Sequence, residues 1–410
     1  MFPDFSVSLL VAAAMILIIA LVRKRCPVGF AILAGGLLIW AVRSADPGLI
    51  LESARKTALS PRNWDLLAAL FAVMVIEEEL KSADAISGMV RALESVFRSP
   101  RVTLLAMPAF VGLLPSAGGA RFSAPIVDTA TRGFGLAPED KAAVNFWFRH
   151  VFENVRPIAP GLILACSLAR VPVGDTIAHL LWTSVLFAAA GWLVMLRPIR
   201  IPEKAKDAET LPRRALFSQA FLAALPIVSS FALMFATDLG AGKSIGLVAA
   251  LMLPVLVLFR KPAPVLQILK EACDWKLFAN VLAILCFIEL VTETGVLQEI
   301  ARDLLAAPLP APFLLGVIGF ILGLIIGMTP GYVGIVMPIA AALYPEGNVP
   351  VAGVILTGGL AGIMLTPTHL CLTVTLEYFK ADLLRTLWPC FKAAAIFIAV
   401  YAAVTVLFWG

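Results

Sequence analysis

The sequence has few charged residues. Asp, Glu, Lys and Arg make up 14% of its 410 residues, whereas 60% are hydrophobic. A soluble globular domain carries about 25% charged residues, so the composition excludes an ordinary water-covered surface. The hydrophobic residues gather in long blocks, such as 7–22, 177–196, 217–236 and 393–409. Because a membrane-spanning helix needs about 20 apolar residues, the sequence predicts an all-α polytopic membrane protein.

Motifs for metal, redox and enzyme chemistry are scarce as well. The six cysteines form no C-x-x-C pair, and the histidines His150, His179 and His369 have no metal-ligand spacing. The sequence contains no H-E-x-x-H, no G-x-G-D and no nucleophile–base pair at helical spacing. We therefore expect no enzyme, no cofactor and no nucleic-acid partner. Bound Na⁺ is the only metal ion that we expect.

The first apolar block lacks the features of a cleavable signal peptide. Asp4 precedes the block and the basic residues 23–25 follow it, whereas a signal peptide has its positive charge first. With the N-terminus outside the cell, most Lys and Arg residues fall in cytoplasmic segments, as the positive-inside rule requires. The sequence thus predicts a multi-pass protein of the cell inner membrane, surrounded by lipid, with both termini outside.

A repeated pattern divides the chain into halves. A shift of 211 residues places Trp64 on Trp275, Glu78 on Glu289, Arg91 on Arg302 and Gly112 on Gly323, and it also superposes apolar blocks. We predict repeats at 1–200 and 215–410, joined by a cytoplasmic linker at 201–214. Each repeat is expected to have five transmembrane helices plus a re-entrant hairpin. Since five is odd, the second repeat would be inverted, as in many secondary transporters. Two unrelated bundles in accidental register are the alternative.

Interrupted apolar stretches at 102–133 and 312–344 are the predicted hairpins. Each consists of two pieces too short to cross a membrane alone, separated by Pro and Gly. Unpaired backbone groups survive at membrane depth only where they line a cavity or pack on protein, and broken helices use them to hold ligands. We therefore predict that the tips bind substrate, unless they are plain tight turns. The tip residues are Ser116, Gly118, Gly119, Arg121 and Ser123 in the first hairpin, and Thr329 and Gly331 in the second.

The span after each hairpin is also interrupted, which predicts broken helices at 145–168 and 350–376. Arg149, Glu153 and Arg156 follow i, i+4, i+7 spacing and are expected on one helical face. Arg121 and Arg156 are predicted to hold an oxyanion through their guanidinium groups. For Arg149, Glu153 and Arg156, a structural ion pair is the alternative.

Polar residues of the two broken helices complete the predicted substrate site. They are Asn154 in the first and Thr366, Thr368 and His369 in the second. His369 is expected to move protons or to donate a hydrogen bond, since imidazole titrates near physiological pH; a packing role is the alternative. Glu289 lies in an apolar run, where it serves either as a structural partner or as a coupling carboxylate.

Several runs of the sequence carry a resemblance to a known family. They are 114–125 (LPSAGGARFSAP), 145–150 (NFWFRH), 366–372 (TPTHLCL) and 377–380 (EYFK). These runs resemble an uncharacterised integral-membrane family placed near the gluconate carriers of the ion transporter superfamily. That superfamily also includes carriers for di- and tricarboxylates and sodium/proton antiporters. The resemblance covers nearly the whole chain.

The resemblance implies an elevator-type carrier that works as a homodimer. It implies sodium sites where a hairpin tip meets a broken helix, here 116–119 with 154–157 and 329–331 with 366–368. On this mapping the coupling-ion candidates are Ser116, Asn154, Pro157, Thr329 and Thr366, with Glu153 and Glu289 as carboxylates. The tips read Ser-Ala-Gly and Thr-Pro-Gly instead of the Ser-Asn-Thr of dicarboxylate carriers, which leaves protons open as the coupling ion.

The sequence thus predicts a secondary active transporter for a small anionic solute, coupled to Na⁺ or H⁺. One alternative is a cation/proton antiporter without an organic substrate, in which Glu289 or Glu153 titrates together with His369. The other is a non-transporting component of a membrane assembly.

Overall fold

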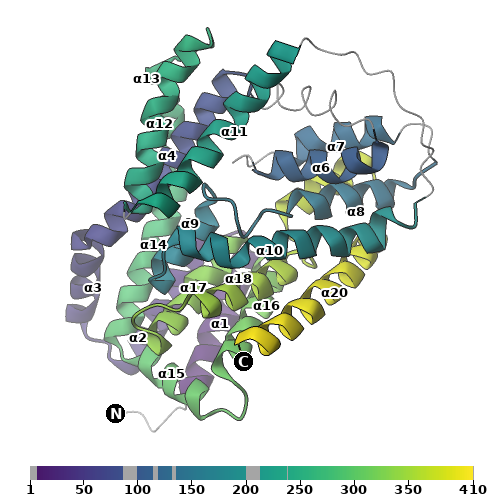
Figure 1. Cartoon of the computed structure of the whole chain (residues 1–410). Coiled ribbons are helices and arrows are strands. Elements are labelled where there is room, and N and C mark those ends of the chain that lie inside the picture. Colours follow the sequence, from purple (N-terminus) through teal and green to yellow (C-terminus); the bar gives the residue numbers. More distant parts are fainter. Residues whose placement is uncertain are drawn as a thin grey trace. The chain divides into compact units, whose positions relative to one another are not determined.

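The computed structural model describes residues 7–85, 99–113, 119–131, 135–199, 213–237 and 239–409. Helices make up the regular structure of these residues, which contain no strand, so the predicted all-α class is confirmed. The chain divides into two compact units, and each unit draws on both halves of the sequence (Figure 1). Unit 1 comprises Met1–Leu70, Pro160–Thr176 and Asp274–Ile363, and unit 2 comprises Phe71–Ala159, Ile177–Cys273 and Met364–Gly410.

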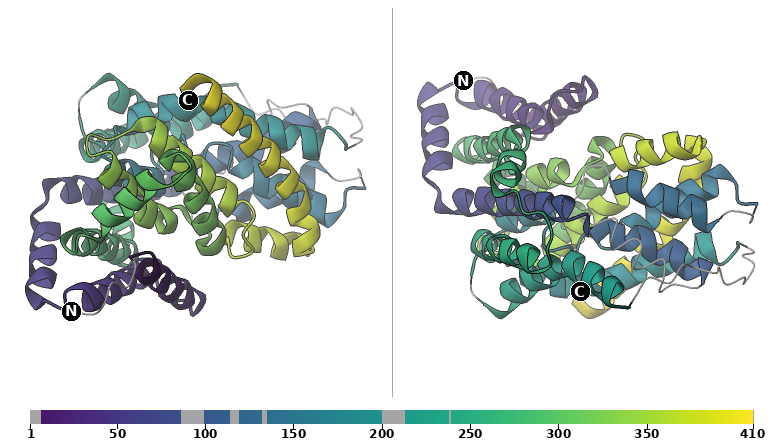
Figure 2. Two further views of the ribbon diagram at one scale, coloured as in Figure 1. Left: turned by 90° about the horizontal axis from the view of Figure 1, so that it is seen from below. Right: turned by 90° about the horizontal axis from the view of Figure 1, so that it is seen from above.

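Unit 1 is assembled around two groups of packed helices. Its elements are α1 (Val7–Arg23), α2 (Val28–Arg43), α3 (Pro47–Leu59), the first part of α4 (Pro61–Ser82), α9 (Pro160–Ala169), α14 (Trp275–Glu293), α15 (Val296–Ala306), α16 (Ala311–Ile326), α17 (Thr329–Leu343) and α18 (Val349–Ile363). Helix α2 packs against α1 and α14, and Figure 2 shows the purple α1 and α2 side by side. Helix α16 packs against α17 and α18, and α17 also contacts α9.

Glycines bring α16 and α18 into close contact. A Cβ atom added at Gly323 would lie 2.3 Å from the carbonyl oxygen of Gly359, and one added at Gly358 would lie 2.4 Å from that of Gly316. At Gly362 the nearest atom would be the carbonyl oxygen of Phe320, at 2.1 Å. Small residues at such spacing let helix backbones approach closely within membranes, where van der Waals packing drives helix association.

Unit 2 is built around α8. Its elements are the rest of α4, α6 (Pro100–Leu113), α7 (Gly119–Ala130), α8 (Pro138–Arg149), most of α10 (Val173–Gly191), the π-helical segment η1 (Trp192–Leu196), α11 (Arg213–Ala236), α12 (Ala241–Leu258), α13 (Val265–Ala272), α19 (Leu370–Phe379) and α20 (Leu383–Trp409). Helices α6, α7, α19 and α20 all contact α8. The Trp147 ring stacks on Phe187 with centroids 4.1 Å apart, and its Nε1–H donates to the Phe187 carbonyl at 3.0 Å. These contacts bury the C-terminal half of α8.

The helices break where Pro and Gly predict it. Helix α8 ends at Arg149 and α9 begins at Pro160, while α18 ends at Ile363 and α19 begins at Leu370. Pro157 and Pro367 lie inside these breaks, and proline disfavours helical backbone at the residue before it. Between α16 and α17, Gly327 takes a left-handed conformation with φ 76°, which glycine adopts at little cost. The first hairpin's interruption at 114–118 lies outside the described residues, between α6 and α7.

The order of the helices repeats along the chain. Helices α16 and α18 begin 211 residues after α6 and α8, and α17, α19 and α20 begin 210 residues after α7, α9 and α10. The bounds of the two repeats, 1–200 and 215–410, stay predictions. The inversion of the second repeat stays a prediction.

Several helices fit a multi-pass membrane protein. Four described helical segments are long and apolar enough to cross a membrane: Val173–Leu196, Ala241–Leu258, Trp275–Glu293 and Leu383–Leu407. Two bent pairs, α3 with α4 and α15 with α16, raise the number to six if each pair forms one span. Many helices beside the breaks are apolar but shorter, as the predicted broken spans require.

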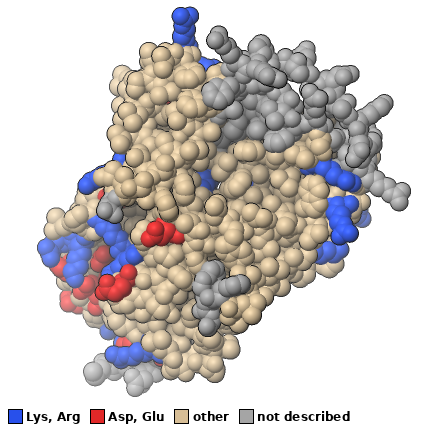
Figure 3. All heavy atoms as spheres, viewed as in Figure 1, with Lys and Arg blue, Asp and Glu red and all other residues tan. Residues whose placement is uncertain are grey.

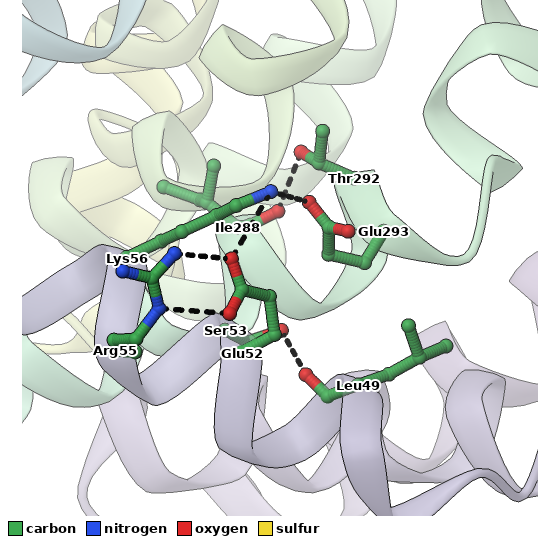
Figure 4. Close-up of polar contacts among 8 residues, drawn as sticks. All are labelled: Leu49, Glu52, Ser53, Arg55, Lys56, Ile288, Thr292 and Glu293. Carbon is green, nitrogen blue, oxygen red and sulfur yellow. Dashed lines mark hydrogen bonds and ion pairs between the residues drawn. The ribbon is translucent and has the colours of Figure 1, made fainter.

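Three short helices, α3, α13 and α15, lie outside the predicted spans. Polar and charged residues of α3 meet α14 in unit 1 (Figure 4). The Arg55 guanidinium donates to Glu52 at 2.8 and 2.9 Å, and Lys56 Nζ lies 2.5 Å from a carboxylate oxygen of Glu293. Figure 3 shows acidic and basic side chains gathered over this part of unit 1. Since these charges pair with one another, α3 is a polar edge of the unit.

Candidate functional site

A buried histidine marks the end of α8 in unit 2. His150 is 4% exposed and caps the helix, with its backbone N–H donating to Trp147. Its Nδ1 lies 2.7 Å from the carbonyl oxygen of Phe146. Because a carbonyl only accepts hydrogen bonds, Nδ1 carries the proton, and Nε2 of the neutral ring presents a lone pair.

That lone pair faces a second histidine from the other break. Nε2 of His150 lies 3.0 Å from Nε2 of His369, which is the N-cap residue of α19. Cys371, in the first turn of α19, completes the group, and one ligand atom from each of the three side chains lies within 4.8 Å of the others. The Phe146 ring covers both imidazoles, with centroids 5.1 and 5.6 Å away.

Two arginines and a glutamate adjoin this group. Arg149 is 6% exposed, and its guanidinium lies within hydrogen-bonding reach of the Cys371 sulfur. Arg156 donates through Nη1 to the carbonyl of Gly112 at 2.6 Å, and its Nη2 lies 3.8 Å from Glu153. These three side chains together carry one net positive charge. Charges inside a membrane protein usually face its interior and mark functional pathways.

The prediction that Arg149, Glu153 and Arg156 share one helical face is wrong, although the three residues lie close together. Helix α8 stops at Arg149, and residues 151–155 form turns. Pro157 and Pro160 lack the N–H groups that would bond the carbonyls of Glu153 and Arg156, so a helix cannot continue through this segment. The chain therefore wraps Glu153 and Arg156 around the helix end instead of projecting them along one side.

Two asparagines add buried polar groups. Asn145 donates from Nδ2 to Oγ1 of Thr375 at 3.0 Å, which ties α8 to α19 inside the unit. Asn154 is 4% exposed, and its Nδ2 has no hydrogen-bond acceptor among the described residues. A buried amide donor without a protein partner costs free energy, so Asn154 is a position where a ligand oxygen would be stabilised.

Thr366 and Thr368 shape the second break. Their hydroxyl oxygens lie 2.9 Å apart, and the backbone N–H of Thr368 donates to Oγ1 of Thr366 at 3.3 Å. These bonds stabilise the turn before α19. The break therefore exposes polar groups of Thr368 and His369 in an otherwise apolar part of the chain.

Other predicted residues belong to unit 1. Thr329 begins α17, where a Cβ added at Gly161 would lie 2.6 Å from the Thr329 methyl carbon, so the two residues pack tightly. Gly331 lies in α17 against Ile326. Glu289, in α14, has Lys56, Glu293, Arg170 and Arg62 as charged neighbours. Both predicted roles of Glu289, structural partner and coupling carboxylate, stay predictions.

The first hairpin tip is described only in part. Ser116 and Gly118 lie outside the described residues, as does the side chain of Arg121. Gly119 begins α7, and Ser123 is fully buried within it. The predicted roles of these residues stay predictions.

His150 and Cys371 were missing from the predicted site. The two histidines are 219 residues apart in the sequence, so no spacing rule brings them together. The available signal was their position, since His150, His369 and Cys371 each stand in or beside a predicted break. Only the packing of α19 on α8 joins them.

The chain has no match among proteins of curated function. Residues 6–408 match the family described as "Protein of unknown function (DUF401)". This confirms the expected membership in an uncharacterised family, whereas the link to the ion transporter superfamily stays a prediction. Because the match covers nearly the whole chain, the protein belongs to the DUF401 family.

Proposed function

We propose that the protein is a secondary active transporter of the cell inner membrane that moves a small anionic solute, coupled to Na⁺ or H⁺. The substrate site is the polar group at the helix breaks of unit 2. Arg149 and Arg156 hold the negative charge, and Asn154 and Thr368 donate hydrogen bonds.

One observation carries the proposal: the two interrupted segments, 150–159 and 364–369, meet in unit 2 through His150 and His369. Broken helices are costly in lipid, because their free N–H and C=O groups need partners. Transporters use such breaks to bind solutes near the membrane midplane. A purely structural membrane protein gains nothing from two of them at one place.

The charge of the site favours an anion. Two guanidinium groups and one carboxylate leave a net positive charge in largely buried surroundings. Arginine binds carboxylates and similar oxyanions through paired N–H donors. A cation would meet repulsion there, unless it accompanied the anion.

The repeated helix order supports an elevator-type mechanism with inverted repeats. Each unit combines helices from both halves of the chain. In unit 2, α7 and α8 come from the first half and α19 comes from the second half. In carriers built from inverted repeats, movement of one repeat or bundle against the other generates alternating access. A homodimer belongs to the same proposal.

The His150–His369 contact favours a second candidate, a cation/proton antiporter. Glu153 is an electrostatic neighbour of both rings, so carboxylate and imidazoles form one connected group for proton exchange. A pH-gradient assay in vesicles separates the candidates. The antiporter moves protons on addition of Na⁺ or K⁺ alone, whereas the symporter requires the anion.

Ligand binding to the purified full-length protein tests the leading proposal. We would measure thermal unfolding with carboxylates, sugar acids, sulfonates and inorganic oxyanions, each with and without Na⁺. A bound anion raises the unfolding temperature of the native protein. The variant Arg156→Gln should lose this shift, and Arg55→Gln, which changes an exposed arginine of unit 1, should keep it.

Two results contradict the proposal. One is that no anion of any class stabilises the protein, in the presence or absence of Na⁺. The other is an anion that stabilises Arg156→Gln as much as the unsubstituted protein.

A further inference from the structure

His150, His369 and Cys371 form a constellation that anion transport does not require. Anion binding uses guanidinium and amide donors, whereas the Cys371 sulfur and the Nε2 lone pair of His150 are acceptors that repel an anion. We propose that these three residues form a binding site for a transition-metal ion of the zinc class. The inference does not depend on the proposed transport function.

The geometry of the two histidines suits a metal. In tetrahedral coordination at about 2.0–2.1 Å, two nitrogen ligands lie about 3.4 Å apart, and a nitrogen and a thiolate sulfur about 3.6 Å. The observed Nε2–Nε2 distance is 3.0 Å, and all three ligand atoms lie within 4.8 Å of one another. Binding thus requires the two rings to separate by a few tenths of an ångström and the Cys371 sulfur, up to 4.8 Å from a ring nitrogen, to approach by about 1 Å.

The ring of His150, the first of the three ligands, is already held in one orientation. Nδ1 of His150 donates to the Phe146 carbonyl, so the Nε2 lone pair points at His369. Metal-ligating histidines almost always donate their other ring N–H in this way. When the metal binds, His369 carries its proton on Nδ1 instead of Nε2. This is a change of tautomer within one neutral ring.

A neighbouring arginine stabilises Cys371 as a thiolate, and the types of ligand atom decide which metal ion binds. Arg149, beside the Cys371 sulfur, offsets the negative charge of a thiolate. Two imidazoles and a thiolate favour Zn²⁺ and similar ions over Mg²⁺ or Ca²⁺, which prefer oxygen. Three protein ligands leave a fourth position open, and Glu153 is the carboxylate neighbouring both rings.

The corresponding positions of the other half carry none of these ligands. The shift between the halves is 211 residues at α8 and α18 and 210 residues at α9 and α19, so His150 corresponds to Ala361, His369 to Ala159 and Cys371 to Gly161. Since alanine and glycine stand at these corresponding positions, a helix break forms there without the three ligands. Their presence where the two breaks of unit 2 meet indicates a chemical role.

Metal binding to the full-length protein in detergent tests the proposal, with Zn²⁺ and Co²⁺ as probes. We expect one Co²⁺ per chain and a thiolate-to-cobalt charge-transfer band. Cys371→Ser should lose the band, and His369→Gln should weaken Zn²⁺ binding at least about tenfold. The matched controls Cys273→Ser, at an exposed cysteine, and His179→Gln, at the third histidine, should bind as the unsubstituted protein does.

X-ray absorption of the Zn²⁺-loaded unsubstituted protein provides a second measurement, which does not depend on any variant folding. We expect one sulfur and two nitrogen ligands. A spectrum without sulfur overturns the proposal, as does Zn²⁺ affinity that is equal in Cys371→Ser and the unsubstituted protein. Neither result bears on anion binding through Arg156, so the transport proposal stands or falls separately.

Discussion

The amide of Asn145 donates to the hydroxyl of Thr375 at 3.0 Å, and both side chains are completely buried. This bond fixes α19 against α8 and so sets the position of Cys371 and His369 relative to His150. We predict that Asn145→Leu and Thr375→Val, which preserve side-chain size, each destabilise the protein by about 1–3 kcal/mol, because each leaves a buried polar partner. Reversible unfolding in detergent measures the loss.

The double variant Asn145→Leu/Thr375→Val provides the control for this bond. If the two side chains interact directly, its loss of stability is smaller than the sum of the single losses, by about 0.5–2 kcal/mol. Additive losses would show that the contact contributes nothing to stability.

Close approach of α16 and α18 gives a second prediction. Gly323→Ala places a methyl group 2.3 Å from the carbonyl oxygen of Gly359, so the helices must separate. We expect the free energy of unfolding to fall by about 1–3 kcal/mol, as it does at other overpacked sites. Gly246→Ala in α12 is the matched control, since its Cβ meets no atom within 4 Å and alanine favours helix. Equal stability of the two variants would argue against the close packing.

The ion pair of Lys56 and Glu293 gives a third prediction. Lys56 is 40% exposed, so solvent screens the pair and its contribution to stability is small. Lys56→Ala should change the unfolding midpoint little, and the change should shrink further in high salt. A large loss of stability that does not depend on salt would mean that the pair is buried in the folded protein, for instance by lipid or a second chain.

The geometry of Arg156 gives a fourth prediction. Its Nη1 donates to the Gly112 carbonyl at 2.6 Å, and the guanidinium is planar, with several donors in fixed directions. Arg156→Lys keeps the charge but removes this geometry. We expect anion affinity to fall about 10- to 100-fold, and the free energy of unfolding to fall by about 1–3 kcal/mol if the Gly112 carbonyl loses its donor. Affinity equal to that of the unsubstituted protein would mean that charge alone matters, and the paired-donor role of Arg156 would be wrong.

The sequence predicted the helix breaks well, because their causes are local. Pro157, Pro367 and Gly327 remove hydrogen-bond donors or permit left-handed backbone, and these effects depend on no distant residue. The helices around the breaks begin and end within a few residues of the predicted positions, with one larger difference: α8 begins at Pro138, ahead of the predicted start at 145.

Relationships between distant residues were not predictable. The sequence contained both His150 and His369, but nothing local states that α19 packs on α8. The spacing of Arg149, Glu153 and Arg156 suggested a helix that the following prolines prevent. The short helices α3 and α15 were missed because their charged residues interrupt the apolar runs by which spans are recognised.

Uptake by the full-length protein in sealed vesicles tests the central claim most directly. The labelled solute is the anion that stabilises the protein most, with Na⁺ and pH gradients imposed in turn. We predict gradient-dependent accumulation that falls about 10- to 100-fold in Arg156→Gln and is unchanged in Arg55→Gln. Undiminished accumulation in Arg156→Gln, or no accumulation under either gradient, would contradict the account.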